Sequence, residues 1–181
     1  MIQSSGDDQE QIWYYNGWTC NNYVNAVLVF CPDGTIPIFC YNVPGTVHDS
    51  MVAIYGNIYN KLKTVFNSCG GCCIVHLAFA CNNYPFLIKS EKSSLEMTLD
   101  EMDLAAEATS MRPSVEWGMQ AFQALFPQVK DHIEFEEAGQ WKLMIKLMIL
   151  FYNLRARRVG INQILNVYMP SFNVDVNQMY E

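Results

Sequence analysis

One short stretch of the sequence gathers several side chains that can bind metal ions. Cys69 and Cys72 form a CxxC pair, and Cys73, His76 and Cys81 follow closely. A structural zinc site needs four such ligands, commonly as two pairs on loops. Here there is one pair, and His76 lies inside an apolar run that is typical of a strand. Two interpretations stay open: a zinc- or thiol-based site at Cys69, Cys72, His76 and Cys81, or buried thiols, which the pattern favours.

Glu116 and a cluster of arginines are the other candidates for chemistry. A two-metal nuclease holds two divalent ions about 3.5–4 Å apart with several carboxylates. One glutamate on a helix is more often a surface residue, and composition and spacing alone favour that interpretation of Glu116. Arg155, Arg157 and Arg158 form a cationic helix end, which the helix dipole favours. A contact with phosphate is the alternative for these arginines.

The composition predicts one folded domain that exposes apolar surface. The chain has 181 residues, of which 51% are hydrophobic and 16% charged. Typical domains carry about 25% charged residues. We therefore expect a protein partner or a second copy of the chain to cover exposed apolar surface. The net charge of −7 opposes non-specific binding to nucleic acid.

The N-terminal residues, the lack of long apolar runs and the cysteines together predict an intracellular protein. Residues 1–12 are polar and acidic, so we expect a loose N-terminus rather than a signal peptide. No run of about 18 apolar residues is present, which predicts no membrane span. The seven cysteines are an odd number, which suits a reducing compartment. We expect a nuclear or cytoplasmic protein that is not secreted.

The first half of the chain predicts a hairpin, a helix and a further strand. Residues 23–31 are apolar on both alternating faces, as in a central strand, and residues 35–41 form a second strand after the turn at Pro32-Asp33-Gly34. A helix capped by Asp49 or Ser50 is expected to run to about Phe66. The strand that follows, 73–79, implies a right-handed parallel crossover.

The second half predicts helices. Residues 89–111 form an acidic insert with a weak helical stripe and a capping box at Ser93 and Glu96. A separate helix is expected from Pro113, a favoured first-turn residue, to Phe126. The last helix is expected over residues 139–155, buried through Trp141, Met144, Met148 and Phe151.

Several long sequence segments resemble one protein family and occur in the same order as in that family. The run YNGWTCNNYVNAVLVFCPDGTIPIFCYNVPGTVHDSMVAIYGNIYNKL, then IVHLAFA with FLIKS, RPSVEWGMQAF and FYNLRARRVGINQILNVY are similar to the catalytic domain of DDE transposases of the PIF/Harbinger superfamily. The resemblance covers about residues 11–170. It implies an α/β, RNase H-like fold: a mixed central sheet flanked by helices. It also implies that 1–181 is a single, partial domain, because the family's first strand, which carries the first acid, should lie upstream.

The same resemblance implies metal-dependent chemistry. The family cleaves and transfers DNA strands with Mg²⁺ or Mn²⁺ held by two aspartates and a glutamate. The glutamate matches Glu116, and Arg112 matches the arginine four positions before it. The second aspartate of the family lies in a motif similar to Val-Asp-Ser-Ala-Phe. The matching residues here are Val-His-Leu-Ala-Phe, so His76 stands at the position of that aspartate. The tyrosine and lysine of the family's pattern correspond to Thr109 and Gln123. Asp49 matches a recurrent family residue outside the triad.

These matches predict a transposase-derived nuclease domain that is catalytically inactive. A neutral imidazole at His76 has one lone pair for a metal and no charge, so it cannot bridge two ions as a carboxylate can, and it favours zinc or copper over magnesium. The alternative is a domesticated binding module for DNA or protein that does not cleave. In either case, Arg112, Arg155, Arg157 and Arg158 are the expected DNA contacts, and Glu116 is the expected metal ligand.

Overall fold

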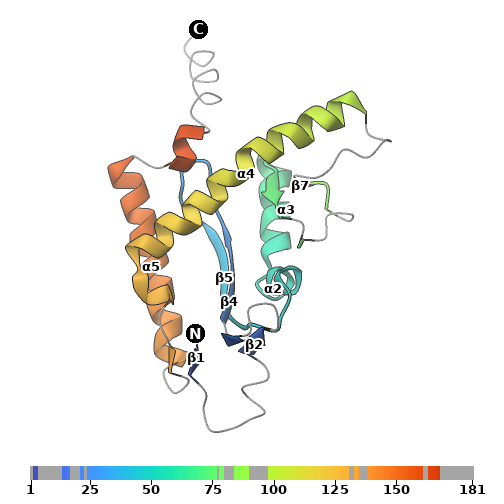
Figure 1. Cartoon of the computed structure of the whole chain (residues 1–181). Coiled ribbons are helices and arrows are strands. Elements are labelled where there is room, and N and C mark those ends of the chain that lie inside the picture. The colour runs from blue at the N-terminus through green and yellow to red at the C-terminus, as the bar shows by residue number, and fades with distance from the viewer. Residues whose placement is uncertain are drawn as a thin grey trace.

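A β-hairpin lies at the centre of the structure (Figure 1), between α-helices on both of its sides. The computed structural model describes residues 2–3, 14–16, 21–22, 24–76, 78–79, 84–89, 98–130, 133–134, 138–160 and 163–167. Over these residues the chain is a mixed α/β fold, as the sequence predicts.

The hairpin pairs β4 (Val24–Val29) with β5 (Ile38–Pro44) in antiparallel register, so that Val27 faces Cys40 and Val29 faces Ile38. The Pro32-Asp33-Gly34 turn joins them as predicted. The Asp33 carboxylate accepts hydrogen bonds from the backbone N–H and the hydroxyl of Thr35, at 2.9 and 2.7 Å. Gly34 adopts φ 80°, a left-handed conformation that glycine tolerates without strain.

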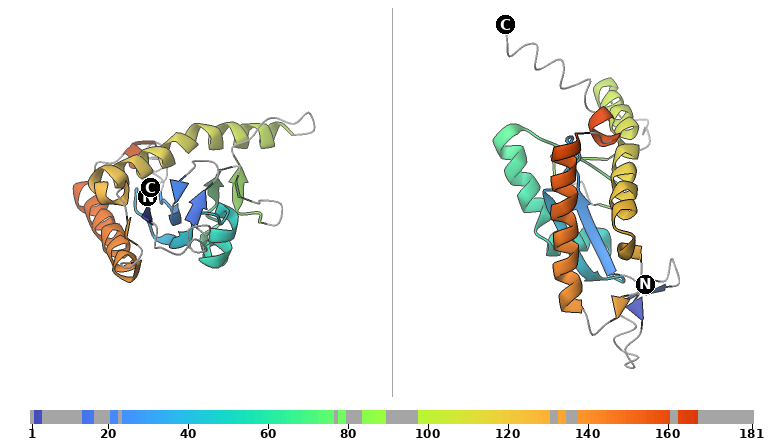
Figure 2. Two further views of the ribbon diagram at one scale, coloured as in Figure 1. Left: turned by 60° about the horizontal axis from the view of Figure 1, so that its bottom comes forward. Right: turned by 90° about the vertical axis from the view of Figure 1, so that its left-hand side faces the viewer.

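Each face of the hairpin contributes to a different hydrophobic core. Figure 2 shows the helices that lie on the two sides of the hairpin. Val27 and Cys40 point to one side, where they pack with residues of α2 (Asp49–Tyr55) and α3 (Ile58–Cys69). Leu28 and Phe39 point to the other side, where they pack against buried residues of α4 (Leu99–Leu125) and α5 (Ala138–Val159). Since successive side chains alternate across a strand, this arrangement explains the uninterrupted apolar run. The predicted two-sided burial is confirmed.

The single helix predicted from Asp49 to Phe66 is wrong, because two helices meet there. Asn57 adopts φ 54°, in the left-handed region, so the first helix cannot continue through it and the second helix begins after it. A Cβ added to Gly56 would overlap Cys40 Cβ, so the chain bends where it touches β5. Asparagine tolerates the left-handed conformation better than most residues. The cap is also different: the His48 ring accepts from Ser50 N at 3.4 Å, and Asp49 is the first helical residue.

The expected boundary at Pro113 is also wrong, since α4 runs through it as one helix. Pro113 cannot donate to the carbonyl one turn earlier, a defect that commonly kinks or ends a helix. Ala108 and Ser114, on either side, are both buried, so tertiary packing overrides the local preference. The Ser114 hydroxyl donates to Met111 O at 2.6 Å. The capping box at Ser93 and Glu96 lies outside the described residues.

The remaining described strands are short and pair two by two. The pairs are β6 (Cys73–Val75) with β7 (Leu87–Lys89), parallel; β1 (Ile2–Gln3) with β8 (Ile133–Glu134), parallel; and β2 (Tyr15–Asn16) with β3 (Asn21–Asn22), antiparallel. A 3₁₀ turn, η1 (Pro127–Lys130), follows α4. The strand predicted over 73–79 therefore ends at Val75, and its described hydrogen bonds go to β7 rather than to β5. Part of the N-terminus predicted to be loose, Ile2–Gln3, is a strand; the rest of 1–12 lies outside the described residues.

The last helix forms as predicted but buries a different face. Met148 is buried, whereas Met144 and Phe151 are exposed and Trp141 is partly buried. The buried face is instead formed by Met148, Ile149 and Tyr152. Because α5 is apolar on nearly all sides, periodicity alone cannot select the face that meets the hairpin.

Asn153 joins α5 to the segment just before β5. Its side-chain oxygen accepts from Ile36 N at 2.7 Å, and its amide nitrogen donates to Ile36 O at 2.9 Å. The fully buried Ile36 therefore has both backbone groups satisfied by one side chain from a distant helix. This pair of bonds fixes the height of α5 along the hairpin.

Candidate functional site

Glu116 and Arg112 lie one turn apart on α4 and form an ion pair. Arg112 Nη2 lies 3.6 Å from Glu116 Oε1. The Glu116 side chain is 62% exposed, so the carboxylate faces solvent on the helix surface. A surface pair of this kind contributes little to stability. The carboxylate that the sequence resemblance predicts as a metal ligand is thus partnered by a cation of its own helix.

His76 lies directly after β6 and is exposed. The interpretation of His76 as part of an apolar strand is wrong, because the strand ends one residue earlier. Its imidazole is available to solvent but offers no negative charge at neutral pH. Since α4 packs against β6, the two sequence-predicted positions are carried by neighbouring elements.

The described side chains do not fit a two-metal site. Across the described ranges, no three His, Cys, Asp or Glu side chains lie close enough together to hold a metal ion. Two divalent cations require several carboxylates around them. Glu116 and His76 supply one carboxylate and one imidazole, so the donor set is too small and too weakly charged for paired Mg²⁺ or Mn²⁺.

The thiols do not behave as the favoured interpretation expected. Cys69 and Cys72 are exposed at the end of α3 and in the loop after it, rather than buried. Both make local hydrogen bonds: Cys69 Sγ to Val65 O at 3.3 Å and Cys72 Sγ to Gly70 O at 3.7 Å. Cys81 lies outside the described residues. Cys40, in contrast, is buried, and this burial raises the pKa of its thiol.

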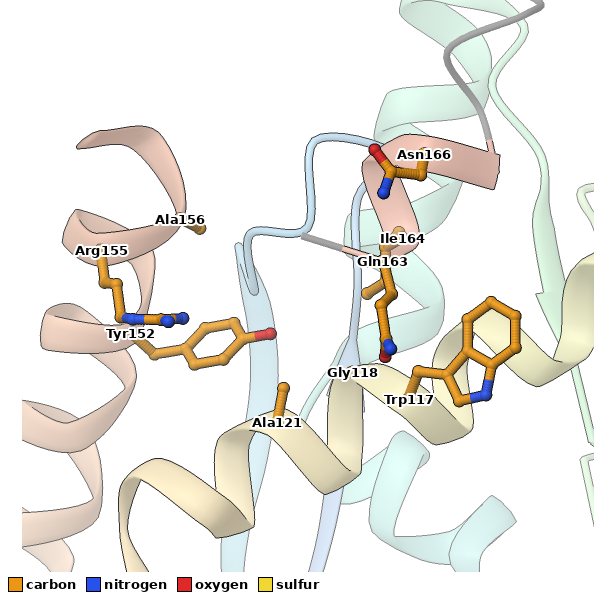
Figure 3. A pocket seen from close by; sticks show the side chains of 9 residues that line it. All are labelled: Trp117, Gly118, Ala121, Tyr152, Arg155, Ala156, Gln163, Ile164 and Asn166. Atoms are coloured by element: carbon orange, nitrogen blue, oxygen red, sulfur yellow. The ribbon is translucent and has the colours of Figure 1, made fainter. Parts of the chain in front are cut away.

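One of the arginines at the end of α5, Arg155, lines a cleft (Figure 3). The cleft has a volume of about 220 Å³ and lies between α4, the end of α5 and a helical turn at 163–167. Arg155 is its charged lining residue, whereas Arg157 and Arg158 are exposed elsewhere on the helix end. Its other lining residues are Trp117, Gly118, Ala121, Tyr152, Ala156, Gln163, Ile164 and Asn166.

Tyr152 and Arg155 give the cleft its electrostatic character. Burial raises the pKa of the Tyr152 phenol, and the positive charge of Arg155 opposes part of that rise. The phenol therefore stays protonated at neutral pH and can donate a hydrogen bond, and its hydroxyl points into the cleft (Figure 3). A guanidinium beside a hydroxyl and two amides suits a small anionic or polar group.

Comparison of the chain with protein-family models, with curated proteins and with solved structures finds no match in any of the three. The site is therefore argued on its own residues. Within the described part of the chain, no helix has both the length and the hydropathy needed to cross a bilayer.

Sequence reasoning did not single out Trp117, Gln163 or Asn166, which line the cleft beside Arg155. Trp117 follows Glu116 directly, and a large aromatic next to a candidate acid is a usable signal. Gln163 and Asn166 carry no such signal, because only the chain's return past α5 brings them to the cleft.

Proposed function

We propose that the chain is a nuclease domain derived from a PIF/Harbinger-type DDE transposase that does not cleave DNA. The weak donor set carries this proposal, because the chain has His76 where the resemblance expects an aspartate, directly after the strand against which α4 packs. Glu116 is a single, 62% exposed carboxylate, and His76 supplies no negative charge with which to hold two divalent cations. An RNase H-like architecture is part of the proposal. Its support is the order of elements: hairpin, helices, short strand, then the helix that carries Glu116.

A non-catalytic binding module is the second candidate. It is favoured by the exposed cations Arg157 and Arg158 at the end of α5, and by Arg155 in the cleft. In this candidate the domain binds DNA phosphates, in spite of the net charge of −7. Replacing all three arginines by alanine should weaken binding to duplex DNA and flatten its dependence on salt. Lys63→Ala, at an exposed position on α3, is the control.

The proposed origin of the domain from a transposase is tested by metal binding rather than by cleavage alone. If positions 76 and 116 derive from one metal site, His76→Asp should increase the affinity for Mn²⁺, measured by electron paramagnetic resonance of free Mn²⁺. Adding Glu116→Gln to His76→Asp should remove that gain. His48→Asp, at another exposed histidine, is the control. In that variant, adding Glu116→Gln should not change the affinity for Mn²⁺.

Inactivity is tested with the unmodified chain. Supercoiled plasmid incubated with the chain and Mg²⁺ or Mn²⁺ should remain uncut, because one carboxylate cannot hold two cations. Metal-dependent nicking that Glu116→Gln abolishes would refute the inactivity. A gain in Mn²⁺ affinity that survives Glu116→Gln would refute the shared ancestry of the two positions.

A further inference from the structure

One face of α5 is apolar and exposed along most of the helix. Its large side chains are 41–60% exposed, although α5 lies against the hairpin on its other side. Figure 2 (right) shows α5 nearest the viewer, with no described element in front of it. The residues that form this α5 outer face are Leu143, Met144, Leu147, Leu150, Phe151 and Leu154.

The spacing of these residues gives a continuous stripe. Each of them lies three or four residues from another member of the set, so at 100° per residue all six fall within about 120° on one side of the helix. The buried residues Met148, Ile149 and Tyr152 lie on the opposite side. Soluble monomers rarely expose a contiguous apolar patch of this kind unless it binds something.

Cations border the α5 outer face. The same helical geometry places Arg158 in line with the stripe at its C-terminal end. Lys146 and Arg157 lie along one edge, and Arg155 along the other. All four side chains are exposed, and the sequence of α5 contains no acidic residue. The face therefore presents an apolar centre with a positive border.

A second copy of the chain does not match this border. Two α5 helices packed face to face in parallel would place cations against cations, and in an antiparallel pair no acid of α5 would meet Arg157 and Arg158. The acidic first half of α4 does not match either. Among its described side chains, the exposed large apolar residues are Met102 and Leu104, which are two positions apart and so point to nearly opposite sides of the helix.

We propose that the α5 outer face binds an amphipathic helix of a partner protein, with an apolar stripe at i, i+3, i+4 and i+7 and with glutamates or aspartates on both flanks. Apolar contacts supply the affinity, and the acidic flanks meet Lys146, Arg155, Arg157 and Arg158, which sets the specificity. This inference does not rest on the transposase origin of the domain.

A pair of synthetic peptides tests the proposal on the full chain. The probe is a helix of about five turns, about 18 residues, with leucines on one face and glutamates on its flanks. The control peptide has the same leucines and carries lysines in place of the glutamates. Fluorescence anisotropy should show binding of the acidic peptide at least about tenfold tighter than that of the lysine peptide, with an affinity that falls as salt is added.

Variants separate the apolar and the charged contributions. Leu147→Ser with Phe151→Ser should abolish binding of the acidic peptide, and both positions are exposed, so the core stays intact. Tyr55→Ser, at an 80% exposed position on α2, is the matched control and should bind as the unmodified chain does. Arg157→Glu with Arg158→Glu should reverse the preference between the two peptides.

Four outcomes would overturn the proposal. The first two are equal binding of the two peptides and no binding of the acidic one. A dimer detected by light scattering that Leu147→Ser with Phe151→Ser dissociates would assign the face to a second copy instead. Tighter binding through the same two residues to vesicles containing phosphatidylserine than to the acidic peptide would assign it to a membrane surface.

Discussion

Replacing Asn153 by alanine should destabilise the fold more than any other exchange of one polar residue on α5. The side chain makes two hydrogen bonds, to Ile36 N at 2.7 Å and to Ile36 O at 2.9 Å. Ile36 is fully buried, and its side chain belongs to the core between the hairpin and helices α4 and α5. Alanine would leave one backbone donor and one backbone acceptor without these partners.

The expected loss follows from these two groups. A buried polar group left without a partner costs about 1–3 kcal/mol. Two such groups give about 2–6 kcal/mol, and because Asn153 is only partly buried, water can reach the site and place the loss near the lower end, at about 2–3 kcal/mol. Domains of this kind have about 5–15 kcal/mol of stability, so the variant should still fold.

Urea unfolding followed by circular dichroism and by tryptophan fluorescence measures the effect. Asn153→Asp is the informative second variant: it keeps an acceptor for Ile36 N but places a carboxylate oxygen against Ile36 O. Because two acceptors repel each other and a charge becomes partly buried, it should lose at least as much stability as Asn153→Ala. Asn60→Ala is the control, because the Asn60 side chain donates to the side chain of exposed Asn57, at 2.6 Å, and to no buried group among the described contacts. A loss below about 0.5 kcal/mol for Asn153→Ala, the range of ordinary surface changes, would refute the reasoning.

Two further predictions concern packing and pH. Gly118→Ala should destabilise by about 1–2 kcal/mol, since a Cβ there would lie 2.7 Å from Ile164 Cδ1; helix propensity alone predicts a gain of about 1 kcal/mol, so urea midpoints settle the sign. Burial raises the pKa of Cys40 from 9.0 and that of Tyr152 from 10.0, so the unfolded chain loses these protons first. The stability that these two groups contribute should therefore be present at neutral pH and be lost as the pH rises through about 9 and 10. Tyr152→Phe should reduce the loss at the upper end of this range, and urea midpoints that do not change up to about pH 10.5 would contradict the prediction.

The elements that the sequence predicted best are those whose local and tertiary requirements agree. The hairpin has a turn that suits its geometry at Pro32-Asp33-Gly34, and its first strand is apolar on both faces because each face meets a core. Local chemistry and packing point to the same structure there. The prediction needed no knowledge of what packs on either side.

The boundaries that failed are those at which packing overrides local preference. Pro113 is a favoured helix start, yet α4 continues across it because Ala108 and Ser114 are both buried. The helix expected to run unbroken past Tyr55 instead turns at Gly56 and Asn57 where it touches Cys40. Neither contact can be seen in the local sequence, because both join segments that are distant along the chain.

The candidate site was predicted in part. The positions of Glu116 on a helix and of Arg155 on the last helix followed from periodicity. The cleft beside Arg155 did not, because it depends on the chain returning to bring Gln163 and Asn166 to α5. The buried face of α5 was also missed, since a helix apolar on most sides gives several equivalent choices.

The central hairpin makes the two cores dependent on each other. Residues 27 and 28 are adjacent, yet Val27 is part of one core and Leu28 packs against the other. Detaching either strand would expose both cores to water at once. We therefore expect amide hydrogen exchange in β4 and β5 to occur only through unfolding of the whole molecule, and the helices on the two sides to melt together in one transition.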